Sequence, residues 1–160
     1  MICYIGLGSN LGDRNSFIQK AIDELDKIAE VCNQSKIYET PPWGDTDQPS
    51  FLNSCVELKC DLPALDLLSE LKKIEDLLGR TKTRKWGPRV IDLDLLFYGS
   101  ETIQSKHLTV PHPELHKRSF VLKPLADIAG QFLHPVLKLS IKQLLDNIDS
   151  SEIHEFNSEQ

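Results

Sequence analysis

Two carboxylates lie two positions apart in the apolar segment "KWGPRVIDLDLLFYG", residues 85 to 99. Successive side chains of a β-strand point to opposite faces, so Asp92 and Asp94 would share one face, with Cα atoms roughly 6.5–7 Å apart. The other face would present Ile91, Leu93, Leu95 and Phe97 to the core. Burying a carboxylate is costly unless it has a partner, so the pair indicates a functional site, and Mg²⁺ is a partner that such oxygens prefer.

A run of positive charge precedes the two aspartates. The stretch "RTKTRKWGPR", residues 80 to 89, holds no acidic residue, although the whole chain has a formal net charge of −6. Its cations are Arg80, Lys82, Arg84, Lys85 and Arg89. Cationic side chains bind phosphate, and carboxylates bind the Mg²⁺ that accompanies a nucleoside triphosphate. The basic run beside the two aspartates therefore favours a triphosphate-binding site over a solvent-exposed loop whose charges have no specific role.

The composition limits the class of protein. A chain of 160 residues can bury a real core, and we expect one domain over residues 1–160 with a polar tail after about residue 150 that can fray. The acidic net charge argues against a nucleic-acid partner. The chain shows no secretory signal and no membrane-length apolar run, and its four cysteines show no CxxC spacing. We therefore expect a disulfide-free cytoplasmic protein that does not enter a membrane.

Hydrophobic spacing predicts the order of the elements. Strands are expected over residues 2–8, 35–39, 51–60 and 90–98, with a short one near 101–104. Helices are expected over 17–29, from Pro63 to Gly79, over 120–129 and from Ser140, where Gln143 completes a capping box. Leu52, Val56, Leu58 and Cys60 should face the core. This order predicts an α+β fold with a ferredoxin-like βαββαβ core and extra C-terminal strand and helix elements.

Several segments resemble a known enzyme family in the same order. "RKWGPRVIDLDLLFYG" resembles the signature of the 6-hydroxymethyl-7,8-dihydropterin pyrophosphokinases. "GLGSNLGDR", "ETPPWGDTDQPSFLN" and "VPHPELHKRSFVLKPLADIA" resemble further family segments, so that the likeness spans about residues 3 to 148. The resemblance implies transfer of diphosphate from ATP to the hydroxymethyl group of 6-hydroxymethyl-7,8-dihydropterin, with release of AMP, in tetrahydrofolate biosynthesis. We expect the protein to act as a monomer.

The resemblance also implies roles for individual residues. Asp92 and Asp94 would hold two Mg²⁺ ions on the triphosphate, and Arg80, Lys82 and Arg89 would act as catalytic cations, the first two on a loop that closes over the reactants. ATP would be bound by Glu75, Lys82, Trp86, Arg89, Leu95, Thr109, His112 and Arg118. The pterin would be bound by Thr40, Pro41, Pro42, Trp43, Phe51, Asn53 and Phe120. In that set Phe51 and Phe120 would sandwich the ring, and the Asn53 amide would pair with its edge.

Other interpretations remain open from the residues alone. Phe51 and Phe120 could be ordinary core residues, and His112 could be a surface residue of a rigid loop. A ferredoxin-like RNA-binding module would need a basic surface and stacking aromatics on the open sheet face. A two-metal phosphodiesterase would need further Asp, Glu or His ligands beside the aspartate pair. Mg²⁺-dependent ATP binding and cleavage of a model diester would separate these classes.

Overall fold

The computed structural model of the chain describes residues 1–42, 47–79 and 89–157. The strands are β1 (Ile2–Ser9), β2 (Glu30–Gln34), β3 (Tyr38–Thr40), β4 (Phe51–Lys59), β5 (Asp92–Tyr98), β6 (Ile103–Gln104), β7 (Thr109–Val110) and β8 (His154–Glu155). The helices are α1 (Arg14–Ile28), α2 (Ala64–Leu77), α3 (Ser119–Ala129), α4 (Ile141–Asp146) and the 3₁₀ turn η1 (Leu115–Lys117). No helix in this described part of the chain is long and apolar enough to cross a membrane.

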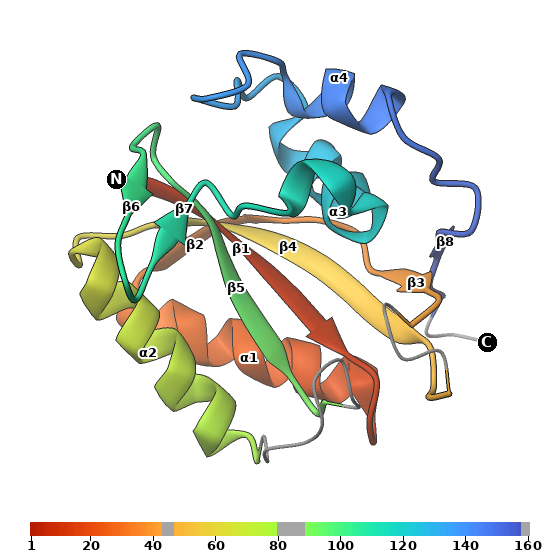
Figure 1. Cartoon of the computed structure of the whole chain (residues 1–160). Helices are drawn as coiled ribbons and strands as arrows, with labels where there is room; N and C mark the ends of the chain where they lie inside the picture. Colours follow the sequence, from red (N-terminus) through yellow and green to blue (C-terminus); the bar gives the residue numbers. More distant parts are fainter. Residues whose placement is uncertain (43–46, 80–88, 158–160) are drawn as a thin grey trace.

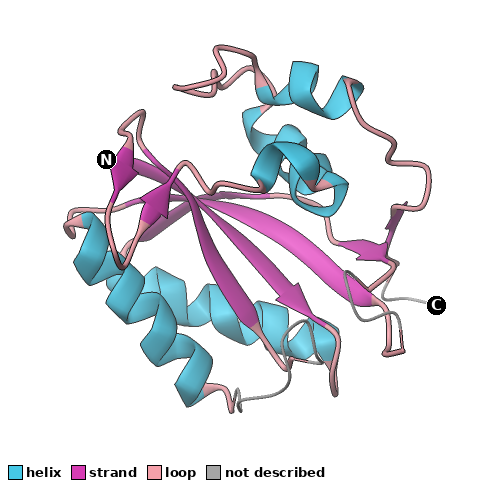
Figure 2. Ribbon diagram, in the orientation of Figure 1, coloured by secondary structure: helices cyan, strands magenta, loops and turns pink. Residues whose placement is uncertain are grey.

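One antiparallel sheet organises the molecule. Its strands run in the order β5-β1-β4-β3-β8, and β2 pairs with the other half of β4, while β6 and β7 form a separate two-stranded sheet. Helices α1 and α2 cover one face of the large sheet, and α3 and α4 cover the other (Figure 1). Figure 2 shows the same layering by type of secondary structure. The α+β prediction is confirmed, and the ferredoxin-like assignment stays a prediction.

The sheet has a hydrophobic core on each face. Leu52, Val56, Leu58 and Cys60 pack with α1 and α2 in the first core, as their alternation predicts. The second core joins the opposite sheet face to α3 and α4 and includes Leu96 and Phe97. Because Leu96 is an extra residue in the pairing of β5 with β1, Phe97 lies in the second core and Tyr98 in the first. The strict alternation expected for this strand was therefore wrong for Phe97 and Tyr98.

Local signals explain most of the helix boundaries. The Asp13 side chain accepts a hydrogen bond from the Ser16 backbone at the start of α1, and Pro63 directly precedes α2. At α4 both halves of the Ser140–Gln143 capping box are present, as predicted. All four cysteines are free thiols.

Three short strands were not expected from the sequence. Strand β2 is almost wholly exposed, so it lacks the apolar alternation that marks a half-buried strand. Strands β7 and β8 contain two residues each, too few for a periodic signal. Strand β8 lies in the polar tail, where it pairs with β3 and the neighbouring Ile153 is buried. The described tail therefore supports the strand that ends at Thr40.

Candidate active site

The floor of the candidate site is the central strand β1, which lies between β4 and β5. Gly8 is in register with Asn53 on β4 and with Asp92 on β5, and Gly6 is in register with Asp94. Neighbouring strands lie about 4.8 Å apart, so the backbones of Asn53 and Asp92 are about 10 Å from each other across Gly8. Because glycine has no side chain, the sheet leaves room between an amide on one side and two carboxylates on the other.

A cavity of about 100 Å³ occupies this room. The predicted site residues that line it are Thr40, Pro41, Phe51, Asn53, Arg89, Asp92, Asp94, Arg118 and Phe120. Its remaining lining comes from Gly6, Leu7, Gly8, Ser54, Cys55, Leu96 and Val121. The structure therefore brings residues predicted to bind phosphate, metal and pterin to a single hollow.

The acidic side of the cavity is built by β5 and its neighbours. Asp92 and Asp94 are partly exposed and line the cavity, whereas the intervening Leu93 is buried in the first core. Arg89 and Arg118 line the same cavity. Within the described ranges, no cluster of three or more His, Cys, Asp or Glu side chains could enclose a metal ion. Two carboxylates fit Mg²⁺ nevertheless, since this ion binds one or two protein carboxylates and takes its other oxygens from phosphate and water.

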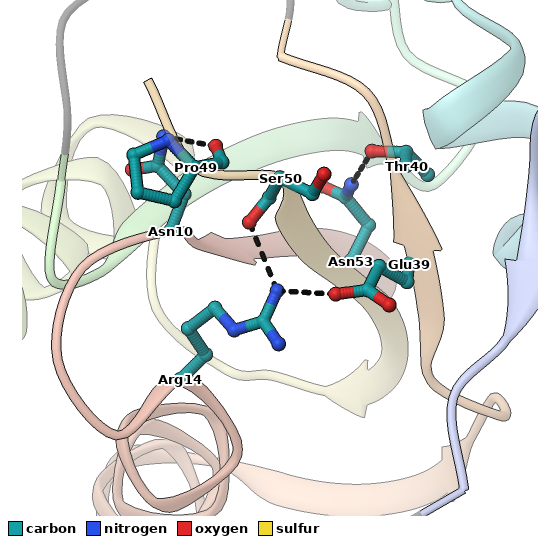
Figure 3. Close-up of polar contacts among 7 residues, drawn as sticks. All are labelled: Asn10, Arg14, Glu39, Thr40, Pro49, Ser50 and Asn53. Atoms are coloured by element: carbon teal, nitrogen blue, oxygen red, sulfur yellow. Dashed lines mark hydrogen bonds and ion pairs between the residues drawn. The ribbon is translucent and has the colours of Figure 1, made fainter.

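The opposite side of the cavity combines a fixed amide with aromatic rings. Asn53 and Thr40 are buried, and the Asn53 Nδ2 donates to Thr40 Oγ1 at 2.7 Å (Figure 3). The Asn53 Oδ1 lies 3.1 Å from the position of a Cβ built on Gly8, so the carbonyl faces the glycine floor. Phe51 from β4 and Phe120 from α3 are partly exposed and line the same cavity. This side can therefore offer hydrogen bonds and ring faces to a flat heterocycle.

His112 lies at the edge of the acidic side. Its backbone N–H donates to Leu96 O at 3.0 Å, and its Nδ1 accepts from the Glu114 backbone N–H at 3.2 Å. Burial, and after it the positive charge of Arg118, lower the pKa of His112 to about 4, while Glu114 and Asp92 act in the opposite direction. The ring is therefore neutral at pH 7, and because Nδ1 is an acceptor, Nε2 carries the proton and can donate it in a hydrogen bond.

This depressed pKa predicts a pH dependence of stability in the metal-free and nucleotide-free protein. The unfolded chain takes up the His112 proton near pH 6.5, whereas the folded chain resists it down to about pH 4. His112 therefore lowers the free energy of unfolding as the pH falls between these values. The free energy of unfolding can be measured with urea at pH 7.5 and at pH 5.0. Between these two values it should fall by about 1–2 kcal/mol less in His112→Gln than in the unsubstituted chain. Equal losses in the two proteins would contradict the assignment.

Other predicted residues lie outside the cavity over Gly6 and Gly8. Glu75 is buried on α2, and its Oε2 accepts from the Leu93 backbone N–H at 2.8 Å, on the far face of β5. Leu95 is buried in the first core, and Thr109 is exposed on β7. Pro42 lines a second cavity of about 170 Å³, which shares Thr40, Pro41 and Phe120 with the first. Trp43, Arg80, Lys82 and Trp86 lie outside the described residues.

Sequence reasoning missed the residues that form the floor and the supports of the site. "GLGSNLGDR" was interpreted as a strand end and a turn-rich loop, although Gly6 and Gly8 are spaced with the strand period. Arg14 donates to Glu39 Oε2 at 2.6 Å and to Ser50 O at 3.0 Å, and Asn10 donates to Pro49 O at 3.1 Å (Figure 3). These bonds connect segments distant in sequence, so nothing in the local pattern indicated them.

Comparison with known proteins identifies the family of this chain. Residues 4–130 match the model of the 7,8-dihydro-6-hydroxymethylpterin-pyrophosphokinase family. A 2-amino-4-hydroxy-6-hydroxymethyldihydropteridine pyrophosphokinase of Aquifex aeolicus is 44% identical over 140 residues, covering 88% of each chain. The enzyme of the same name from Bacillus subtilis is 47% identical over 132 residues, covering 81% of this chain and 79% of that one. The chain belongs to this pyrophosphokinase family.

Solved structures show the same fold. A Plasmodium falciparum HPPK-DHPS crystal structure with SDX-DHP superposes with a TM-score of 0.73 at 19% sequence identity. The match covers 91% of this chain but only 43% of the larger Plasmodium chain. At this identity the likeness concerns the fold alone, and it adds to the family assignment a common arrangement of helices and sheet.

Proposed function

We propose that this chain transfers a diphosphate group from ATP to the hydroxymethyl group of 6-hydroxymethyl-7,8-dihydropterin in the cavity over Gly6 and Gly8. AMP and the pterin diphosphate are the products, as in the folate-synthesis reaction of its family. One observation carries the proposal: the Asp92–Asp94 pair and the Asn53–Thr40 pair line opposite sides of one hollow. The backbones of Asn53 and Asp92 lie about 10 Å apart across Gly8, which leaves space for the reacting hydroxymethyl group and phosphate over the glycine.

The pterin side recognises and orients the acceptor. The bond from Asn53 Nδ2 to Thr40 Oγ1 fixes the amide, so that its Oδ1 over Gly8 can accept from the amino or ring N–H groups of the pterin edge. Phe51 and Phe120 contact the faces of the ring. Fixing the ring fixes its hydroxymethyl substituent, and such orientation supplies much of the catalysis in reactions between two bound substrates.

The phosphate side holds and neutralises the triphosphate. Asp92 and Asp94 would bind two Mg²⁺ ions, which supply positive charge to the phosphate oxygens when bound. Arg89 and Arg118 donate to phosphate oxygens, and the neutral His112 adds its Nε2–H. Cys55 is the thiol in the cavity lining, and burial raises its pKa, so it stays protonated and does not act as a nucleophile. The reaction therefore rests on positioning and charge rather than on a covalent intermediate.

The remaining assignments complete the proposal from the family resemblance. Arg80 and Lys82 act as catalytic cations, and Lys82 and Trp86 contribute to ATP binding. Glu75, Leu95 and Thr109 contribute on the nucleotide side, and Pro41, Pro42 and Trp43 on the pterin side. The enzyme acts as a cytoplasmic monomer without nucleic-acid or membrane partners.

The test is turnover with the reduced hydroxymethyl pterin in the presence and absence of Mg²⁺. Turnover should require both ATP and Mg²⁺, and replacing Mg²⁺ by EDTA should weaken ATP binding by at least about tenfold. Pterin binding to the nucleotide-free protein should be the same in both conditions. Turnover without a divalent cation would refute the proposal, and cleavage of a model phosphodiester without pterin would favour the phosphodiesterase alternative.

A further inference from the structure

A tyrosine and an aspartate join the strand and the helix that carry part of the pterin side. Tyr38 begins β3 and is buried. Its hydroxyl donates to the carboxylate of Asp127 on α3, and the phenol oxygen lies 2.8 Å from Oδ2 and 3.0 Å from Oδ1. The Lys36 backbone N–H donates to the same Oδ2 at 3.2 Å. Burial, and after it the hydrogen bond to Asp127, raise the pKa of Tyr38, so the phenol keeps the proton that it donates.

The other ends of both elements reach the candidate active site. On β3, Thr40 lies two positions after Tyr38, so both side chains point to one face of the strand, and Thr40 lines the cavity. On α3, Phe120 lies seven positions before Asp127. This spacing is close to two full turns, so both side chains lie on one face of the helix, about 10 Å apart along its axis. The bond between Tyr38 and Asp127 therefore connects the strand that carries Thr40 to the helix face that carries Phe120.

Apolar packing does not by itself define one placement of α3. The helix contributes apolar side chains to the second core, among them Leu122 and Leu125. Such contacts are non-directional, so they favour burial of the helix more than one orientation of it. Hydrogen bonds require short distances and good angles, so those that Asp127 accepts from Tyr38 and Lys36 favour a single placement. Asp127 itself is exposed, so its removal would leave no cavity in either core.

We propose that Asp127 is a positioning residue for the pterin ring: its hydrogen bonds to the segment before Thr40 hold α3 where Phe120 can stack on the ring. The strength of a ring contact depends on the separation and offset of the two planes, so a small shift of the helix weakens it. Asp127 is not among the residues that line either cavity, so it acts through Phe120 rather than by touching substrate. The inference rests on the proposed function, in which Phe51 and Phe120 contact the faces of the pterin.

The experiment measures pterin binding by calorimetry in the presence of Mg²⁺ and a saturating, unreactive ATP analogue. Asp127→Ala should raise the dissociation constant of the pterin by about three- to tenfold, the range expected when one good ring contact is lost. Asp127→Asn should bind within about twofold of the original, because one amide oxygen in the place of Oδ2 can accept from both Tyr38 and the Lys36 N–H. Asp146→Ala is the control, since Asp146 is an exposed carboxylate at the end of α4, and it should leave pterin binding unchanged.

The same substitution in a Phe120→Leu chain separates positioning from a general effect on structure. Leucine keeps an apolar side chain at this position but has no ring to align. If Asp127 acts through the ring of Phe120, adding Asp127→Ala to Phe120→Leu should change pterin binding by less than about twofold. A merely structural role would weaken binding by the same factor in both chains. Should Asp127→Ala fail to fold by circular dichroism, Tyr38→Phe replaces it in both chains, because phenylalanine keeps the buried ring and removes the hydroxyl donor.

The outcomes separate this inference from the proposed function. If the unsubstituted chain binds no pterin under these conditions, the proposed function fails. If it binds pterin but loss of the Tyr38–Asp127 bond leaves the dissociation constant unchanged, the inference is overturned while the function stands. An equal loss of affinity in the original and the Phe120→Leu chains would overturn it as well.

Discussion

Asp92→Ala and Asp94→Ala are each expected to lower turnover by at least about a hundredfold in a protein that still folds. The catalytic loss follows because each carboxylate would hold Mg²⁺ against a transition state whose charge lies on phosphate oxygens. The fold should persist because both side chains line a cavity rather than the core, whereas Leu93 between them is packed.

The measurement is steady-state turnover at saturating Mg²⁺, with thermal unfolding of each variant as a check on folding. Asp23→Ala is the matched control, since Asp23 is an exposed carboxylate on α1 away from the cavity, and its loss should leave turnover unchanged. Near-original turnover in both Asp92→Ala and Asp94→Ala would remove the basis for the metal assignment.

Gly8→Val is expected to raise the dissociation constant of the pterin by at least about a hundredfold. A Cβ at Gly8 would lie 3.1 Å from Asn53 Oδ1 and 3.6 Å from Phe51 Cδ1, and the valine methyl groups would extend further into the cavity. The substituted floor would displace the amide and fill the space that the ring needs. Valine suits a β-strand, so the sheet should still form, and binding of the ATP analogue should change by less than about threefold.

Gly6→Ala is the control for a smaller change to the same floor. A Cβ at Gly6 meets Leu96 side-chain atoms at 3.5 Å or more, which is ordinary contact, and it does not approach Asn53. Pterin binding by Gly6→Ala should therefore stay within about tenfold of the original. If pterin binds equally well to Gly8→Val and the original chain by calorimetry, the ring does not lie over Gly8 and the proposed orientation is wrong.

Local periodicity was enough to predict some parts of the site. Asp92 and Asp94 share a face because side-chain direction alternates along any strand, and this holds whichever strand lies beside them. The capping box at Ser140 was equally predictable, since both of its members lie in one turn. Such features depend on neighbours in sequence, so spacing alone carries the information.

Other parts depend on partners distant in sequence. The register that places Gly8 between Asn53 and Asp92 is set by strand pairing, which no short segment specifies. Asn10 and Arg14 looked like ordinary loop residues, because their partners lie at least 25 positions away. The extra residue at Leu96 also escaped notice, since an apolar run with both faces buried gives no sign of where alternation breaks. The resemblance to the family supplied the roles that periodicity could not.

The central claim is that this cavity transfers two phosphates together, and the nucleotide product tests it most directly. Attack of the pterin hydroxyl at the β-phosphorus leaves AMP, whereas attack at the γ-phosphorus leaves ADP. The N-terminal "GLGSNLGDR" lacks the GxxxxGK[ST] pattern of a P-loop that cradles phosphates in many γ-phosphoryl transferases. Chromatography of a quenched reaction should show AMP and a pterin bearing a diphosphate in a one-to-one ratio. ADP with a pterin monophosphate, or nucleotide hydrolysis that does not depend on pterin, would contradict the account.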